Sequence, residues 1–362
     1  MRDVKIQCTI GPSCNDPEIL AEMLEAGMDV ARVNLSHGSA ESQADKLENF
    51  RYAAKKMGKE QAAIMFDIRG PEIRVKEIPG ERIFAAEGET LVLRCEGVED
   101  DGKVEYDENA TKWGSYAVNI IRINYEKLCD EVVTGNEILI DDGRVKLTVE
   151  SVTGRDIVCY VDRGGTIESR KGVNVPDVKL QMDYLGEDDK EDILWCIANG
   201  VDYIACSFIR RKADVELVRN LLDANGGKNV GLIAKIESKE AISNIEAIAE
   251  AADQVLVARG DMGVEIGFEK VPAVQKRIIR RCRERGKAVI IATQLIDSMT
   301  ENKTPTRAEV SDIANAVFDG ATDLMVTGET AKGRYPVQVV REMAKIIEQA
   351  ERDAEKYGQE IL

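Results

Sequence analysis

The chain of 362 residues is 44% hydrophobic and 32% charged, which is enough for one large core and a second domain. Its formal net charge of −17 repels nucleic acid and anionic lipid, so we expect neither as a partner, and any phosphorylated substrate would need local cations. The first residues already resemble a strand, so we expect no signal peptide, and no apolar run approaches the ~20 residues of a membrane helix. The eight cysteines are scattered without a C-x-x-C pair, which predicts a cytoplasmic protein with reduced thiols.

A repeated unit runs along the chain, in which an amphipathic helix ends at a glycine and a short apolar strand follows. Gly27, Gly200 and Gly320 stand at such points. A glycine just past a helix is typical of a left-handed C-cap, and the apolar run after it is typical of a buried parallel strand. The pattern predicts eight strands, at residues 4–10, 30–34, 63–67, 203–207, 231–235, 254–258, 288–292 and 324–327. A helix follows each of them except the third.

After the third strand the repeat is interrupted by a segment that favours short antiparallel strands. These are expected at residues 89–94, 137–140, 144–149 and 156–161, with Asp142-Gly143 as a hairpin turn. The predicted fold is therefore an α/β protein, a (β/α)8 TIM barrel with a small all-β domain inserted after strand 3. Residues 1–72 and 173–362 form the barrel and residues 73–172 the insert. An open doubly wound sheet is the weaker alternative, because no G-x-G-x-x-G follows the first strand.

The carboxyl ends of barrel strands carry the active site, and two of the predicted strand ends stand out. Lys235-Ile236-Glu237 and Arg259-Gly260-Asp261 each supply one carboxylate, enough to anchor Mg²⁺ or Mn²⁺ with positions left for substrate oxygens. Lys235 lies two residues before Glu237, so both point to one face of the strand. A lysine there can stabilise negative charge on an enolate or a transferring phosphoryl group. The competing interpretation is a structural salt bridge at the barrel mouth.

A second group of polar residues follows strands two and three. Asn34, Ser36 and Asp67 offer oxygens that suit a monovalent cation, and Arg32 suits a phosphate. An ordinary polar loop is an equally good interpretation of this group taken alone. His37 is the only histidine, and a single histidine is more often a surface or packing residue than a general base.

Beyond these clusters, eleven ordered motifs resemble the pyruvate kinase family. They are CTIGPS at 8–13, ARVNLSHG at 31–38, DIRGPEIR at 67–74, IDDG at 140–143, KGVNVP at 171–176, SFIR at 207–210, KIE at 235–237, VARGDMG at 257–263, ATQ at 292–294, PTRAE at 305–309 and GETAKG at 328–333. The similarity covers nearly the whole chain and is weakest in the inserted segment.

The resemblance implies transfer of a phosphoryl group from phosphoenolpyruvate to ADP, giving pyruvate and ATP in glycolysis. It further implies that Glu237 and Asp261 bind the divalent metal and that Lys235 stabilises the transferring phosphoryl. Arg32 would contact phosphate, while Gly260 and Thr293 would help to hold the substrate carboxylate. Thr293 would also lie near the path that protonates the enolate.

The same resemblance implies a potassium site and a nucleotide site. Asn34, Ser36, Asp67 and the carbonyl of Ile68 match the potassium ligands, and Arg74 and Lys171, with the loop from Asn34 to His37, match contacts to ADP or ATP. An acid at the position of Glu72 goes with potassium dependence in the family. The insert would act as a lid on hinges near 71–74 and 172–176, and the resemblance leaves room for a homodimer formed through the barrel.

Three departures from the family pattern are visible. Ile68 and Arg69 stand where Thr and Lys are usual, and Thr327 replaces a common Ser. We expect the chain to lack the family's C-terminal domain, with its sugar-phosphate effector site, and therefore to show hyperbolic kinetics insensitive to fructose 1,6-bisphosphate. Two other functions stay open. A metal-dependent aldolase or lyase acting through a pyruvate enolate would not need Arg74 and Lys171, and a non-catalytic barrel would be expected to have lost Lys235, Glu237 or Asp261.

Overall fold

A computed structural model describes residues 2–96, 112–113, 116–117 and 119–358. The chain forms two compact units. The barrel unit comprises Met1–Gly70, Tyr184–Met262 and Glu269–Leu362, and the inserted unit comprises Pro71–Asp183 with Gly263–Phe268. The inserted unit is thus longer than the predicted 73–172 segment, because residues beyond both ends, and one distant stretch, pack with it.

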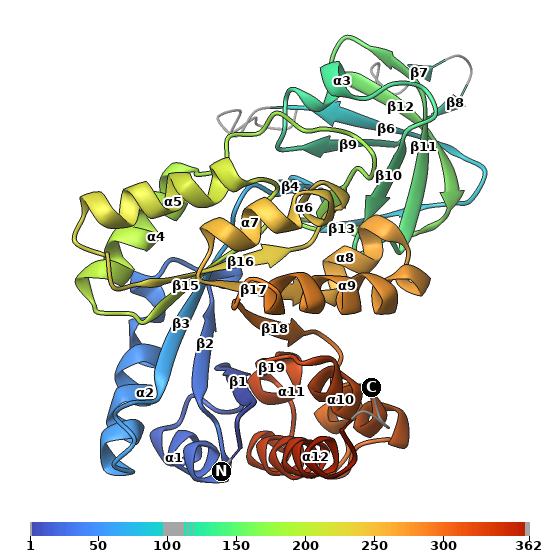
Figure 1. Cartoon of the computed structure of the whole chain (residues 1–362). Helices are drawn as coiled ribbons and strands as arrows, with labels where there is room; N and C mark the ends of the chain where they lie inside the picture. The colour runs from blue at the N-terminus through green and yellow to red at the C-terminus, as the bar shows by residue number, and fades with distance from the viewer. Residues whose placement is uncertain (1, 97–111, 114–115, 118, 359–362) are drawn as a thin grey trace. The chain divides into compact units, whose positions relative to one another are not determined.

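Eight parallel strands of the barrel unit close into a barrel in the order β1-β19-β18-β17-β16-β15-β3-β2 (Figure 1). This closure confirms the predicted (β/α)8 barrel and rules out the open sheet. β3 pairs in parallel with β15 although the insert separates them in the chain. The strands are β1 Lys5–Thr9, β2 Val30–Asn34, β3 Ala63–Ile68, β15 Tyr203–Cys206, β16 Gly231–Ile236, β17 Gln254–Ala258, β18 Ala288–Ala292 and β19 Asp323–Val326.

Helices follow the strands and begin and end at the expected signals. Asp16 caps α1 by accepting the amide of Glu18, with Pro17 in the first turn, and Gly27 and Gly320 end α1 and α10 at φ of +119° and +97°. The helices are α1 Pro17–Ala26, α2 Ala44–Lys56, α4 Glu187–Ala198, α5 Lys212–Ala224, α6 Lys239–Ser243, α7 Ile245–Ala251, α8 Arg259–Ile266, α9 Val271–Arg283, α10 Arg307–Asp319, α11 Gly328–Ala331 and α12 Pro336–Tyr357, with 3-10 turns η1 Leu35–His37, η2 Glu41–Gln43, η3 Phe268–Lys270 and η4 Asp297–Thr300.

The inside of the barrel is a packed hydrophobic core rather than a pore. Alternate residues of each strand point inward, and burying each aliphatic side chain contributes about 1.5–3 kcal/mol. Polar side chains of the strands are therefore displaced to the two ends of the barrel. The buried members of this core are Val30, Met65, Ala205, Ile233, Leu256, Ala258, Ile290, Ala292 and Met325.

The inserted unit is built on a seven-stranded sheet, ordered β4-β14-β10-β11-β12-β6-β9. Asp142 and Gly143 lie in the turn between β10 and β11 at φ of +54° and +74°, which confirms the predicted hairpin. One short helix, α3 Leu128–Glu131, departs from the all-β expectation. The strands are β4 Ile73–Arg74, β5 Arg82–Ala85, β6 Thr90–Cys95, β7 Lys112–Trp113, β8 Tyr116–Ala117, β9 Asn119–Ile123, β10 Glu137–Ile140, β11 Val145–Thr153, β12 Asp156–Arg163, β13 Gly165–Glu168 and β14 Gly172–Asn174.

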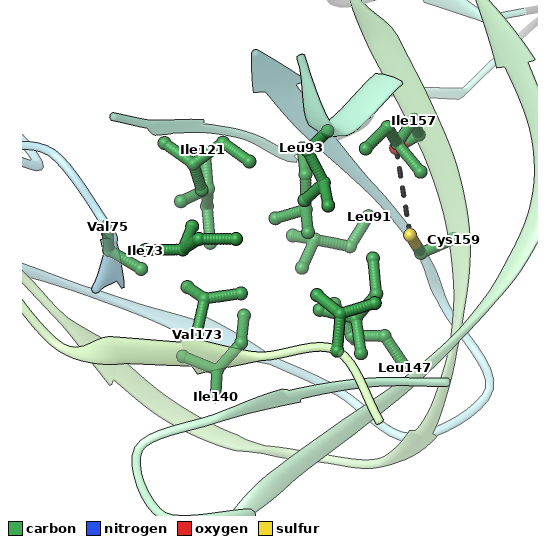
Figure 2. Close-up of a cluster of buried hydrophobic side chains, with 14 of the residues drawn as sticks. Ile73, Val75, Leu91, Leu93, Ile121, Ile140, Leu147, Ile157, Cys159 and Val173 are labelled. Atoms are coloured by element: carbon green, nitrogen blue, oxygen red, sulfur yellow. Dashed lines mark hydrogen bonds between the residues drawn. The ribbon is translucent and has the colours of Figure 1, made fainter. Parts of the chain in front are cut away.

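The inserted unit has a hydrophobic core of its own. Figure 2 shows aliphatic side chains from strands far apart in the sequence gathered between the strands, together with the buried thiol of Cys159. All eight cysteine thiols are free, and only Cys129 is not fully buried. Across the part of the chain that is described, no helix is long and apolar enough to cross a membrane.

Candidate functional site

The arginine in the middle of β2 is held by the aspartate next to the last residue of β3. Nε and Nη2 of Arg32 donate to Oδ2 of Asp67 at 2.9 and 2.6 Å, and Nη1 donates to the hydroxyl of Thr9 at 3.0 Å. All three side chains are buried at the carboxyl ends of their strands. Burial alone would raise the pKa of Asp67, but the charges of Lys235 and Arg32 outweigh it and hold this pKa below the ordinary value.

Lys235, from β16, lies between the other strand ends. Its Nζ is 3.2 Å from Oδ1 of Asp67 and 3.1 Å from Oε1 of Glu237, and it donates to the hydroxyl of Ser207 at 2.7 Å. Burial acts to lower the pKa of Lys235, but Asp67 and Glu237 more than compensate and raise it, so the ammonium stays charged. The predicted alignment of Lys235 and Glu237 on one strand face is what the structure shows.

Glu237 and Asp261 bring two carboxylates to adjacent strand ends. Oε2 of Glu237 accepts the amide of Phe208 at 2.6 Å, and Asp261 lies in the first turn of α8. The pKa of Glu237 is raised to about 7, because burial outweighs the opposing charge of Lys235 and the charge of Asp261 acts in the same direction as burial. Two carboxylates that disfavour each other's charge are an arrangement that a divalent cation would relieve.

The carboxylates of Glu237 and Asp261 suit Mg²⁺ or Mn²⁺ with coordination positions left open for other ligands. Among the residues that the structure describes, no three His, Cys, Asp or Glu side chains are close enough to hold a metal together. Glu237 and Asp261 would supply two oxygen ligands, and Mg²⁺ commonly completes such a site with water and substrate oxygens.

The residues expected at a potassium site also meet at neighbouring strand ends. Asn34 and Asp67 are register partners on β2 and β3, and Oδ1 of Asn34 accepts the amide of Ser36 at 3.1 Å. Ile68 is the last residue of β3 and is buried. Amide, hydroxyl, carboxylate and carbonyl oxygens together suit a monovalent cation.

Thr293 and Gly260 lie against each other at the ends of β18 and β17. A Cβ added to Gly260 would be 3.1 Å from Cγ2 of Thr293, so the glycine backbone approaches the threonine closely. Thr293 adopts φ of +76°, an unfavourable value for a β-branched residue. Arg259 stabilises this conformation, because its Nη2 donates to the carbonyl of Thr293 at 2.5 Å while Nη1 is 2.8 Å from Asp312.

The two cations expected to contact a nucleotide lie in the inserted unit. Arg74 of β4 pairs with Glu72 at 2.6 Å, and Lys171, next to β14, pairs with Asp141 at 3.0 Å. Arg74 and Gly172 are register partners, so Arg74 and Lys171 lie at one edge of the sheet. The expected contact by His37 concerns a side chain that lies outside the described residues.

Three residues that support this arrangement have no role in the sequence-based prediction. Ser207 donates its hydroxyl to Asp67 at 3.0 Å while accepting from Lys235, and Phe208 supplies a backbone amide to Glu237. Arg259 supports Thr293 from the neighbouring strand. The first had a signal, since Ser207 is polar and follows a buried strand. A backbone amide leaves no signal in a sequence.

The family model described as "Pyruvate kinase, barrel domain" matches residues 1–340. The chain belongs to the pyruvate kinase family. This confirms the resemblance found in the motifs.

Individual relatives agree with this membership. "Pyruvate kinase" of Geobacillus stearothermophilus is 45% identical over 347 residues, covering 95% of this chain and 56% of that protein. The Mycobacterium tuberculosis H37Rv "Pyruvate kinase" is 43% identical over 346 residues, covering 95% and 69%. A crystal structure of a pyruvate kinase from Cryptosporidium parvum matches with a TM-score of 0.87 at 38% identity, covering 97% of this chain and 70% of that one. The chain spans little more than half the length of the first curated relatives that it matches.

Proposed function

We propose that the chain transfers a phosphoryl group from phosphoenolpyruvate to ADP, giving pyruvate and ATP. The observation that carries this proposal is Lys235, a buried and charged ammonium held among Asp67, Ser207 and Glu237 at the strand ends. Membership in the pyruvate kinase family supports the same reaction.

The charges of the cluster suit a reaction between two anions. Arg32 and Lys235 face three carboxylates, those of Asp67, Glu237 and Asp261, so the protein groups alone carry one more negative than positive charge. A bound divalent cation reverses this balance and supplies polarisation of phosphoryl and carboxylate oxygens. The site then attracts anionic substrates although the whole chain carries a net charge of −17.

Each residue takes a part in the proposed chemistry. Lys235 and Arg32 stabilise the phosphoryl group as its bond to the enol oxygen breaks and a bond to the terminal ADP oxygen forms. Gly260 and Thr293 orient the substrate carboxylate, with the amides at the start of α8 as donors. The enolate that is left takes a proton on its methylene carbon along a path near Thr293. Arg74 and Lys171 contact the nucleotide phosphates.

A coupled assay for pyruvate tests this proposal directly. Pyruvate should form from phosphoenolpyruvate only when ADP and Mg²⁺ or Mn²⁺ are both present, because the phosphoryl group needs an acceptor and the carboxylate pair needs its cation. Pyruvate formed from a larger hydroxy acid without ADP would instead indicate the aldolase or lyase alternative. Failure to turn over either substrate, with the metal bound, would indicate a non-catalytic barrel.

We further propose that the reaction needs K⁺, held by Asn34, Ser36, Asp67 and the Ile68 carbonyl. Glu72 supports this in the family pattern, since a lysine at that position could take the place of the cation. Activity should be low in tetramethylammonium buffer and restored by K⁺. Equal activity with and without K⁺ would rule the site out, and Glu72→Lys should weaken the dependence.

A further inference from the structure

The dipeptide Ser207-Phe208 contacts the site at two points. The hydroxyl of Ser207 lies between Lys235 and Asp67, at 2.7 and 3.0 Å. The amide of Phe208 donates to Oε2 of Glu237 at 2.6 Å. A displacement of this one peptide would therefore disturb a proposed metal ligand and the proposed phosphoryl-stabilising lysine at once.

The conformation of this peptide is strained. Phe208 has φ of +55°, in the left-handed region that bulky residues avoid. Rotating the plane of the Ser207–Phe208 peptide would change this angle and release the strain, so the observed orientation must be held by its hydrogen bonds.

The opposite side of the peptide is held by a buried tyrosine. The hydroxyl of Tyr184 donates to the carbonyl of Ser207 at 2.9 Å, and Tyr184 is only 4% exposed. Gly70 covers the same carbonyl, since a Cβ at this position would lie 2.4 Å from the Ser207 oxygen. Gly70 is the last residue of the barrel unit before the insert and Tyr184 is the first after it.

We propose that Tyr184 is a positioning residue of the site, acting through the Ser207–Phe208 peptide. The carbonyl of Ser207 and the amide of Phe208 belong to one planar group, so fixing the first fixes the direction of the second. By holding the carbonyl, Tyr184 keeps the amide on Glu237 and the Ser207 hydroxyl between Lys235 and Asp67. The effect on catalysis rests on the proposed function, whereas the effect on metal binding does not.

Tyr184→Phe tests the proposal, because it removes the hydroxyl and keeps the ring. Mn²⁺ binding to the full chain, followed by the electron paramagnetic resonance of free Mn²⁺, should weaken about 3- to 10-fold, the worth of one hydrogen bond. The kcat should fall at least as much, with little change in the KM for ADP. Tyr203→Phe is the matched control, because Tyr203 lies at the amino end of β15, the strand that leads to Ser207. It should change neither quantity.

A second variant separates positioning from a general loss of stability. Glycine tolerates φ of +55° without strain, so Phe208→Gly added to Tyr184→Phe should restore part of the Mn²⁺ affinity. A packing defect at Tyr184 would gain nothing from this change.

Three results would overturn the proposal. They are wild-type Mn²⁺ affinity in Tyr184→Phe, a fall in melting temperature with unchanged Mn²⁺ affinity, and loss of affinity that Phe208→Gly does not relieve. If the wild-type chain binds Mn²⁺ but makes no pyruvate, the proposed function fails while the Mn²⁺ measurements still decide the role of Tyr184.

Discussion

The two ends of the barrel bury the same kind of group in opposite ways. At the carboxyl end, Asp67 is held between Arg32 and Lys235, whose charges outweigh burial and lower its pKa. At the amino end, burial raises the pKa of Asp323, which accepts a hydrogen bond from Gln7 at 2.9 Å. One carboxylate is kept charged by cations, and the other is held mainly by neutral donors.

This contrast separates what the fold needs from what the site needs. The hydroxyl of Thr322 also donates to Asp323. The hydrogen bonds from Gln7 and Thr322 lower the pKa of Asp323 more than the charge of the exposed Lys5 does. Asp323 is thus held mainly by neutral donors, whereas Asp67 is held by the two buried cations Arg32 and Lys235.

The largest expected effect is the loss of Asp261. In Asp261→Ala the carboxyl end keeps its cations but only one carboxylate of the metal pair, so turnover should fall by at least about 1000-fold and Mn²⁺ should no longer bind. Circular dichroism and the melting temperature should show an intact fold. A variant that kept most of its activity would show that the metal lies elsewhere.

Asp67→Asn should be the most damaging change for stability. It leaves Arg32 and Lys235 buried without their shared anion, which costs about 3–5 kcal/mol in comparable buried pairs. Urea unfolding followed by circular dichroism measures the loss. Asp323→Asn is the matched control at the other end and should cost about 1 kcal/mol or less, because neutral donors can also serve an amide. Equal losses at both ends would show that the two carboxylates contribute to stability in the same way.

Lys235→Met should lower kcat by roughly 100- to 1000-fold. The charge of Lys235 is needed more as the phosphoryl group transfers than when the substrate binds, so the KM for phosphoenolpyruvate should change little. Steady-state kinetics across phosphoenolpyruvate concentrations distinguish the two effects. A large rise in KM at unchanged kcat would make Lys235 a binding residue only.

The smallest expected effect is the pH dependence contributed by Asp323. Its pKa is raised in the folded chain, so the native state holds this proton more tightly than the unfolded state does. The free energy of unfolding of the wild type should therefore fall, relative to Asp323→Asn, as the pH rises above the ordinary value of 3.8. For Asp67, whose pKa is lowered, the sign reverses and stability is lost as the pH falls below that value. Urea unfolding measured at several pH values gives the difference in free energy of unfolding between the wild type and each variant. If this difference changed with pH in the same direction for Asp323→Asn and Asp67→Asn, the prediction would be contradicted.

The sequence predicted the barrel well because each of its strands is a local apolar run bounded by a glycine or a polar residue. It also placed Lys235 and Glu237 on one face, since that relation depends only on the alternation of side chains along β16. The contact between Tyr184 and the Ser207 carbonyl could not be found in this way. It depends on a backbone group and on the three-dimensional path of the chain around the insert.

The extent of the insert was hard to predict for a related reason. Gly263–Phe268 belongs to the inserted unit although it follows β17 of the barrel in the chain. Only long-range packing shows this membership, and a single sequence carries no record of such contacts. The short helix α3 was missed because four residues give no helical period to detect.

The pairing of β4 with β14 also bears on how such a chain could have been assembled. These neighbouring strands lie near the two ends of the Pro71–Asp183 segment, so the chain enters and leaves the sheet at points about one strand spacing, ~5 Å, apart. A segment attached in this way can change in length at modest cost, because the cost of closing a loop grows only slowly with its length. The Pro71–Asp183 segment can thus vary in length while the pairing of β3 with β15 keeps the same register.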